Sequence, residues 1–224
     1  MSDNTVRIAG ILVDSFFPLL KAGLLYTVPL TIISFVLGLF VAFITATVRI
    51  LDIKPFAKIA EFYVWIIRGT PLLVQLFIIF YGLPSLGITI DAFISAIIGF
   101  TLSVGAYSSE IIRAAILSVS KGQWEAAHAL GISKKQALIH IIVPQAIKFA
   151  IPPLSNSFIS LVKDTSLAAS ITYTEMFRVA QQITARTYEP LWMYTEVAVI
   201  YLMFCTVLNI LQTKMEILFE RSGN

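Results

Sequence analysis

A run of 27 residues without a charged side chain constrains this chain more than any other feature. The run extends from Ala22 to Val48, and Arg49 follows it at once. About 20 apolar residues suffice for a helix to cross the hydrocarbon core of a bilayer. The run is also too long for the apolar core of a signal peptide, so we expect a membrane helix that stays in the protein.

The composition of the whole chain favours an integral membrane protein. Hydrophobic residues make up 58% and charged residues 13% of the 224 positions, and the mean hydropathy is +0.86. Soluble domains carry roughly 25% charged residues. The single cysteine, Cys205, excludes an intrachain disulfide. The net charge of +3 does not indicate nucleic-acid binding, because the basic residues are scattered among connections between apolar segments.

The apolar segments predict an all-α integral membrane protein with about five transmembrane helices. We expect these helices near residues 22–48, 59–82, 92–117, 147–163 and 191–213. Residues 1–20 mix apolar side chains with Arg7 and Asp14, which predicts either an interfacial helix or a disordered segment. No repeat or polar linker divides the chain, so we expect one transmembrane domain over residues 1–224.

The distribution of basic residues predicts the orientation of these helices. If Arg49 lies in the cytoplasm, most cations outside the spans collect on the inner side. The inner group is Arg49, Lys54, Lys58, Lys121, Lys134, Lys135, Lys148, Lys214 and Arg221, and the outer group is Arg7, Lys21, Arg178 and Arg186. Cytoplasmic connections are typically the ones rich in Lys and Arg. We therefore expect the N-terminus outside and the C-terminus in the cytoplasm.

The longest hydrophilic stretch, residues 118–145, carries the start and stop signals of short helices. Ser120 and Ser133 are each followed three residues later by a glutamine, which predicts two capping boxes. Gly131 between them suits the left-handed position that ends a helix. We expect a helix near 121–130, a sharp corner and a second helix. These signals alone leave open whether the loop docks a partner or only joins two spans.

The spacing within this loop resembles the EAA loop of the membrane subunits of ATP-binding-cassette (ABC) importers. The matching positions are Glu125, Ala126, Ala127, Gly131, Ile141 and Pro144, while Val143 stands where that family usually has Leu. The resemblance implies a type I importer permease whose cytoplasmic coupling helix docks into a separate ATPase. The coupling residues it implies are Trp124, Glu125, Ala126, Ala127, Leu130 and Gly131. The chain has no GxxxxGK[ST] motif, so ATP and Mg²⁺ are expected on the partner ATPase, with no cofactor in this chain.

Ionisable side chains inside the apolar segments are costly, about 2.5–3.5 kcal/mol each on insertion scales, and each calls for a partner or a function. Arg68 opens the motif RGTPLLVQL, in which Pro71 predicts a kink. Glu110 and Arg113 lie three residues apart on one helical face and are expected to neutralise each other. A third motif, KDTSL, begins at Lys163.

As a set, these motifs resemble the polar amino acid branch of importer permeases, over most of residues 20–215. The resemblance implies a substrate path near the bilayer midplane, formed by helix breaks and buried polar groups. The residues expected to line it are Gln75, Glu110, Lys163, Asp164, Thr165 and Ser166. The alternative for Lys163 and Asp164 is a salt bridge that holds the helices together.

The resemblance also implies the partners and the location of the chain. These are a cytoplasmic ATPase dimer, a second permease chain, an extracytoplasmic solute-binding protein, membrane lipid and an amino acid, in a bacterial inner membrane. His128 and His140 lie in the polar loop without clustered carboxylates, so no metal site is expected. Two other classes stay open: a membrane-embedded enzyme, for which no histidine is available inside the spans, and an ion-coupled transporter, which usually has inverted repeats.

Overall fold

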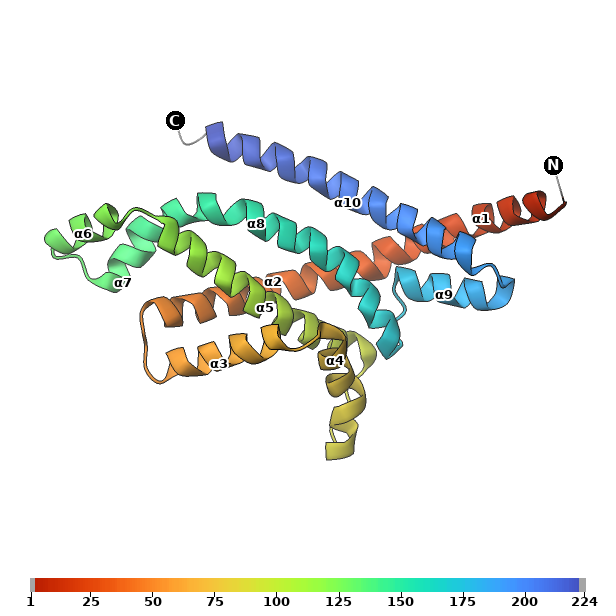
Figure 1. Ribbon diagram of the computed structural model, residues 1–224, viewed down its shortest axis with the longest axis horizontal. Coiled ribbons are helices and arrows are strands. Elements are labelled where there is room, and N and C mark those ends of the chain that lie inside the picture. Colours follow the sequence, from red (N-terminus) through yellow and green to blue (C-terminus); the bar gives the residue numbers. More distant parts are fainter. Residues whose placement is uncertain (1–2, 222–224) are drawn as a thin grey trace. The chain divides into compact units, whose positions relative to one another are not determined.

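The computed structural model describes residues 3–221, and every regular element in this range is helical (Figure 1). The α-helices are α1 Asp3–Ala22, α2 Val28–Ile50, α3 Phe56–Gly69, α4 Leu72–Phe77, α5 Ala92–Ser118, α6 Lys121–Ala129, α7 Lys134–Ala137, α8 Val143–Asp164, α9 Met176–Thr187 and α10 Pro190–Arg221. Short π-helical turns occupy Gly23–Thr27, Ile78–Gly82 and Leu138–Ile142, and 3₁₀ turns occupy Leu83–Leu86 and Thr165–Ile171. The all-α prediction is confirmed.

Four helical runs among the described residues are long and apolar enough to cross a membrane, and a broken pair of helices makes a fifth. The four runs are Asp3–Ile50, Ala92–Ser118, Lys134–Ile171 and Pro190–Lys214. The broken pair is Phe56–Gly69 with Leu72–Leu86. Thr70 is extended, with φ −122° and ψ 146°, because a residue that precedes proline avoids the helical region. The expected kink at Pro71 is therefore confirmed.

The N-terminal segment is helical, so the alternative of a disordered segment is wrong for its described part. Helix α1 leads through a π-helical turn into α2. Its apolar side chains contribute to a core, in which Leu19 is fully buried. Its polar side chains also have partners: Arg7 pairs with Glu189, and the Ser15 hydroxyl donates to the Glu196 carboxylate at 2.5 Å. The place of α1 at the membrane interface stays a prediction.

Chain contacts divide the described residues into two compact units. Unit 1 comprises residues 3–33, 73–99 and 159–210, and unit 2 comprises residues 34–72, 100–158 and 211–221. The core of unit 1 joins α1, α9 and the first half of α10. Its buried members are Leu19, Ala22, Met176, Ala180, Met193, Val197 and Ile200. The prediction of one transmembrane domain stays a prediction.

The core of unit 2 joins the end of α5 to the polar loop and to the start of α8. Its buried members, called the inner cluster below, are Ala115, Ile116, Val119, Leu138, Ile142, Ala146 and Ala150. Ile50, Leu51 and Trp124 pack against this cluster from its edge. The loop is thus fixed to the membrane helices of its own unit by apolar contacts.

Within unit 2, α2 and α5 approach closely at a glycine. A Cβ atom added to Gly38 would lie 2.6 Å from the Cβ of Val104, too close for any other residue without a shift. Small residues allow membrane helices to pack backbone against backbone. This contact holds α2 beside α5, which carries Glu110 and Arg113 nearer to its C-terminal end.

Candidate functional site

The first helix of the polar loop, α6, follows Ser120 as its N-cap but lacks the predicted capping box. The Ser120 hydroxyl accepts from the Gly122 N–H at 3.3 Å, so it does cap the helix. The Gln123 side chain does not return to Ser120; its carbonyl accepts from the Gln145 amide of α8 at 3.3 Å. The box prediction is wrong here because a donor from another helix, invisible in the local sequence, engages the glutamine.

The second capping box is present, and it starts α7. The Gln136 N–H donates to the Ser133 hydroxyl at 3.3 Å, and the Ser133 N–H donates to the Gln136 side-chain carbonyl at 3.2 Å. Both groups lack a helical partner at a helix start, and the box satisfies them reciprocally. The predicted second helix is confirmed.

Gly131 forms the corner between the two helices, as predicted. Its φ is +72°, in the left-handed region that glycine adopts without a Cβ penalty. The Gly131 N–H donates to the His128 carbonyl at 2.9 Å, and the Ile132 N–H donates to the Ala127 carbonyl at 3.0 Å. This pair of bonds is the Schellman motif, which satisfies the last carbonyls of a helix. Space around a Cβ at Gly131 is open, so only the backbone angle requires glycine.

The predicted coupling residues divide between the two faces of α6. Ala127 is 2% exposed, and Trp124 packs against the inner cluster, so these two hold the helix to its own unit. Glu125, Ala126 and Leu130 are exposed, Leu130 at 78%. Among the side chains that the structure describes, none forms an ion pair with Glu125. The exposed members of this set therefore offer one small side chain, one apolar side chain and one carboxylate without an ion pair among the described side chains.

Glu110 lies between two arginines in unit 2. Arg113 donates to one of its carboxylate oxygens through Nε at 3.1 Å and Nη2 at 2.8 Å, which confirms the predicted pair. The other oxygen pairs with Nη1 of Arg49, at the end of α2. Sequence spacing missed Arg49, since it is 61 positions away. Arg68, the first residue of the RGTPLLVQL motif, stacks over the Tyr107 ring, with its Cζ 5.3 Å from the centroid.

The KDTSL motif lies where α8 changes into a 3₁₀ turn. The Thr165 hydroxyl donates to the Val162 carbonyl, and the Ser166 hydroxyl donates to the Lys163 carbonyl, each at 2.7 Å. Lys163 and Asp164 are exposed, and neither forms an ion pair within 4.0 Å with any of the described side chains. The helix break thus presents neighbouring charges of both signs.

The structure places five of the six expected substrate-path residues in unit 1 and one in unit 2. Gln75, with 9% exposure, lies in α4, and it belongs to the same unit as residues 163–166. Glu110 belongs to unit 2, where its charge is already met by two guanidinium groups.

Glu175 is a buried carboxylate that the sequence reasoning missed. It is 0% exposed and caps α9, accepting from the N–H groups of Phe177 at 2.8 Å and Arg178 at 2.7 Å. The Tyr201 hydroxyl donates to it at 2.8 Å. Burial raises the pKa of the Glu175 carboxyl from 4.5 to about 7, although these hydrogen bonds oppose the rise. Glutamate is not among the preferred capping residues, so no helix-start signal points to it.

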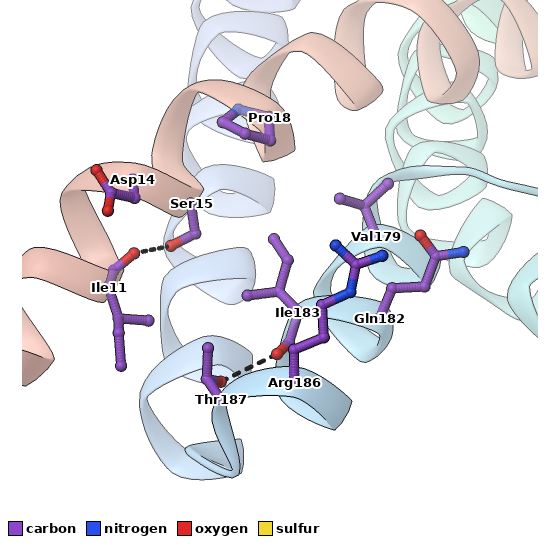
Figure 2. Close-up of a pocket in the computed structure, with 9 residues that line it drawn as sticks. All are labelled: Ile11, Asp14, Ser15, Pro18, Val179, Gln182, Ile183, Arg186 and Thr187. Atoms are coloured by element: carbon purple, nitrogen blue, oxygen red, sulfur yellow. Dashed lines mark hydrogen bonds between the residues drawn. The ribbon is translucent and has the colours of Figure 1, made fainter.

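A groove of about 360 Å³ lies between α1 and α9 in unit 1 (Figure 2). Its polar residues include Asp14, Gln182 and Arg186, and its apolar ones include Pro18 and Ile183. In Figure 2 the Arg186 guanidinium lies on the Gln182 side of the groove, whereas the Asp14 carboxylate turns away from both. The sequence predicts Arg186 only as a cation of the outer group, and no local pattern indicates the groove.

Comparison with known proteins decides the family of this chain. Residues 34–216 match the family described as "binding-protein-dependent transport system inner membrane component". The chain belongs to this family. It is a membrane transport subunit and not an enzyme, which excludes the alternative of a membrane-embedded enzyme.

Several named relatives resemble this permease over nearly their whole length. It is 52% identical over 209 residues to the L-cystine transport system permease protein TcyB of Bacillus subtilis (strain 168), covering 93% of this chain and 89% of the relative. It is 36% identical over 200 residues to the arginine transport system permease protein ArtQ of the same organism, covering 89% and 91%.

Solved structures confirm the type I importer permease fold. A chain from the crystal structure of an amino acid ABC transporter with histidines is 35% identical, with a TM-score of 0.85 and coverage of 91% of this chain and 95% of that one. A chain of the MetNI methionine ABC transporter in inward-facing conformations is 20% identical, with a TM-score of 0.68 and coverage of 96% and 98%. The second likeness shows the fold alone.

The raised pKa of Glu175 predicts how the stability of the permease depends on pH. Below pH 4.5 the carboxyl is protonated in the folded and the unfolded protein, and its stabilising effect is complete. Between pH 4.5 and 7 only the folded protein holds the proton, so the free energy of unfolding falls as the pH rises. The total fall is on the order of 3 kcal/mol, from about 1.4 kcal/mol per pKa unit. Glu175→Gln keeps an acceptor and removes this titration.

The measurement is the unfolding midpoint of the wild type and of Glu175→Gln in detergent at pH 5 and pH 8. We expect the wild type to lose more stability than the variant between the two pH values. Equal losses in both proteins would show that Glu175 does not titrate in this window.

Proposed function

We propose that this permease imports a polar amino acid and that L-cystine is the first substrate to test. The identity of 52% with a relative named for L-cystine transport supports this choice. A second relative named for L-cystine transport, TcyL of Bacillus subtilis (strain 168), is 40% identical over 201 residues. Relatives named for arginine and glutamine transport are 36% and 39% identical. We therefore propose polar amino acids as the substrate class.

The proposed assembly has two permease chains, two cytoplasmic ATPases that bind ATP and Mg²⁺, and a solute-binding protein outside. The family description, which names binding-protein dependence and the inner membrane, supports the outer partner and the location. The N-terminus then lies outside and the C-terminus lies in the cytoplasm. The excess of Lys and Arg on the proposed inner side supports this orientation.

The proposal that this chain couples to the ATPase rests on the exposed face of α6. Glu125, Ala126 and Leu130 are exposed on a short helix whose other face is fixed by Trp124 and Ala127. Small side chains allow the groove of a partner to close on a helix, and a single apolar residue can anchor the contact. The helix cannot tilt freely because Trp124 packs against the inner cluster and Ala127 is buried. Such a fixed helix can transmit a displacement of the ATPase to the rest of its unit.

The backbone of Gly131 gives the test of this coupling. A β-branched residue at a φ of +72° is a strong outlier, whereas asparagine visits this region at lower cost. Gly131→Val should leave the protein inserted and abundant but should lower the ATPase stimulation caused by loaded binding protein at least about fivefold. Gly131→Asn, the matched control, should keep most of the stimulation.

The measurement is ATP hydrolysis by the complete complex in proteoliposomes with and without loaded binding protein. Normal stimulation in Gly131→Val would contradict the coupling role of α6. A similar loss in both variants would mean that the glycine is needed for a reason other than its backbone angle.

The proposal of a substrate path rests on the break at the end of α8. An amino acid is a zwitterion, so its site must supply groups of both signs or helix ends. Lys163 and Asp164 are unpaired neighbours among the described residues, and helix breaks at membrane depth are tolerated where they line a cavity. Thr165, Ser166 and the buried Gln75 supply polar atoms in the same unit. We propose that Asp164 faces the ammonium group of the substrate and Lys163 its carboxylate.

Glu110 has weaker support as a path residue than the other five. Its two carboxylate oxygens already accept from Arg113 and pair with Arg49. A substrate ammonium would have to compete with both guanidinium groups. Its role in the path stays a prediction.

Asp164→Asn tests the path, since it keeps the shape and an acceptor while it removes the charge. A hydrogen bond to a charged group contributes about 1.5–3 kcal/mol, so uptake should fall about tenfold or more. Basal ATPase activity, assembly and the melting temperature should stay at wild-type values. The matched control is Asp52→Asn, in the connection after α2, where the carboxylate is 66% exposed.

Uptake of radiolabelled amino acid per assembled complex is the measurement. Asp52→Asn should transport normally. Normal uptake per complex in Asp164→Asn, together with a lower melting temperature, would assign Asp164 a structural role and overturn the path.

A further inference from the structure

The last carbonyl of α2 is held by a side chain of the polar loop, residues 118–145, which is called the coupling loop below. Helix α2 ends at Ile50, and the final carbonyls of a helix lack partners within it. The Lys134 ammonium donates to the Ile50 carbonyl at 2.9 Å. Lys134 is the first residue of α7, which is 84 positions further along the chain. A cation at this place also interacts favourably with the helix dipole.

The neighbouring residue of α2 is held by α5. Arg49 pairs with Glu110, and Arg113 donates to the same carboxylate. The side chains of Arg49 and Glu110 are only 16% and 19% exposed. Partly buried pairs are screened much less than surface pairs, so this contact fixes the end of α2 against α5 more firmly than an exposed ion pair would.

Apolar contacts join the same three elements. Ile50 and Leu51 pack against the inner cluster, which contains Leu138 and Ile142 from the turn that follows α7. The end of α2 therefore contacts the coupling loop through a hydrogen bond and through buried apolar side chains, and it contacts α5 through an ion pair.

We propose that these contacts form a joint that passes a displacement of the coupling loop to α2 and α5 together, with Lys134 as a positioning residue. The joint consists of Lys134, the Ile50 carbonyl, Arg49 and Glu110. It rests on the proposed coupling of α6 to an ATPase. Two consecutive residues of α2 have such contacts: Ile50 contacts the loop and Arg49 contacts α5. The end of this helix therefore moves with both elements.

Lys134 is the residue to test, because its removal leaves no buried charge unpaired. Replacing Arg49 or Glu110 would strand a partly buried partner and could prevent folding. Lys134→Met keeps the length of the side chain and removes its donor. Lys135→Met is a matched control, since Lys135 is the adjacent exposed lysine of α7 and its side chain forms no ion pair with any of the side chains that the structure describes. Lys134→Arg should retain the contact.

The experiment uses the complete complex in proteoliposomes and measures amino acid transported per ATP hydrolysed. We expect Lys134→Met to lower this ratio at least about fivefold and Lys135→Met and Lys134→Arg to stay within about twofold of the wild type. ATPase binding and the melting temperature should not change in any of them. A purely structural contact would change the melting temperature and leave the ratio unchanged.

Equal ratios in Lys134→Met and Lys135→Met, in a system where the wild type couples normally, would overturn the joint and leave the proposed function intact. A drop in melting temperature without a change in the ratio would also overturn it. A wild-type complex that binds no ATPase would overturn the proposed function, and the joint with it.

Discussion

Within hydrocarbon, each backbone N–H and carbonyl must find its partner inside the protein, and the rest of this structure depends on that requirement. It explains why all regular elements in residues 3–221 are helical. It also gives meaning to the places where a helix is interrupted. The break at Thr70 and the 3₁₀ turn from Thr165 both fall within the polar motifs of the chain. Interruptions of this kind are expected where a helix lines a cavity rather than where it faces lipid.

Ionisable side chains of this permease lie in three different environments, and each environment suits a different role. Glu110 is neutralised by two arginines, which suits a fixed contact between helices. Glu175 is buried without a cation and accepts three hydrogen bonds, so burial raises its pKa to about 7. Lys163 and Asp164 have no ion pair among the described residues. Groups that are not already paired remain available for a ligand.

Local features of this permease could be predicted from its sequence, and contacts between distant residues could not. Apolar runs predict the approximate spans because hydropathy is a local property. The left-handed backbone of Gly131 and the capping box at Ser133 can also be predicted, because they depend on residues within one turn. The pairing of Arg49 with Glu110 joins helices 61 positions apart, so no spacing rule reveals it. The Ser120 box failed for the same reason, since Gln145 lies 22 positions from Gln123. The roles proposed for α6 and for the KDTSL motif come from the family resemblance, because the residues alone leave them open.

A cysteine at Leu130 tests most directly whether α6 meets the ATPase on the inner side of the membrane. Leu130 is 78% exposed, and Tyr188, in the proposed outer connection, is 84% exposed, so the two positions form a matched pair in a Cys205→Ala background. Leu130→Cys should cross-link to the ATPase in assembled complexes and should resist impermeant thiol reagents added to intact cells, while Tyr188→Cys should show the reverse. Labelling of Leu130→Cys from outside, or cross-linking of the ATPase to Tyr188→Cys alone, would contradict both the orientation and the coupling of this permease through α6.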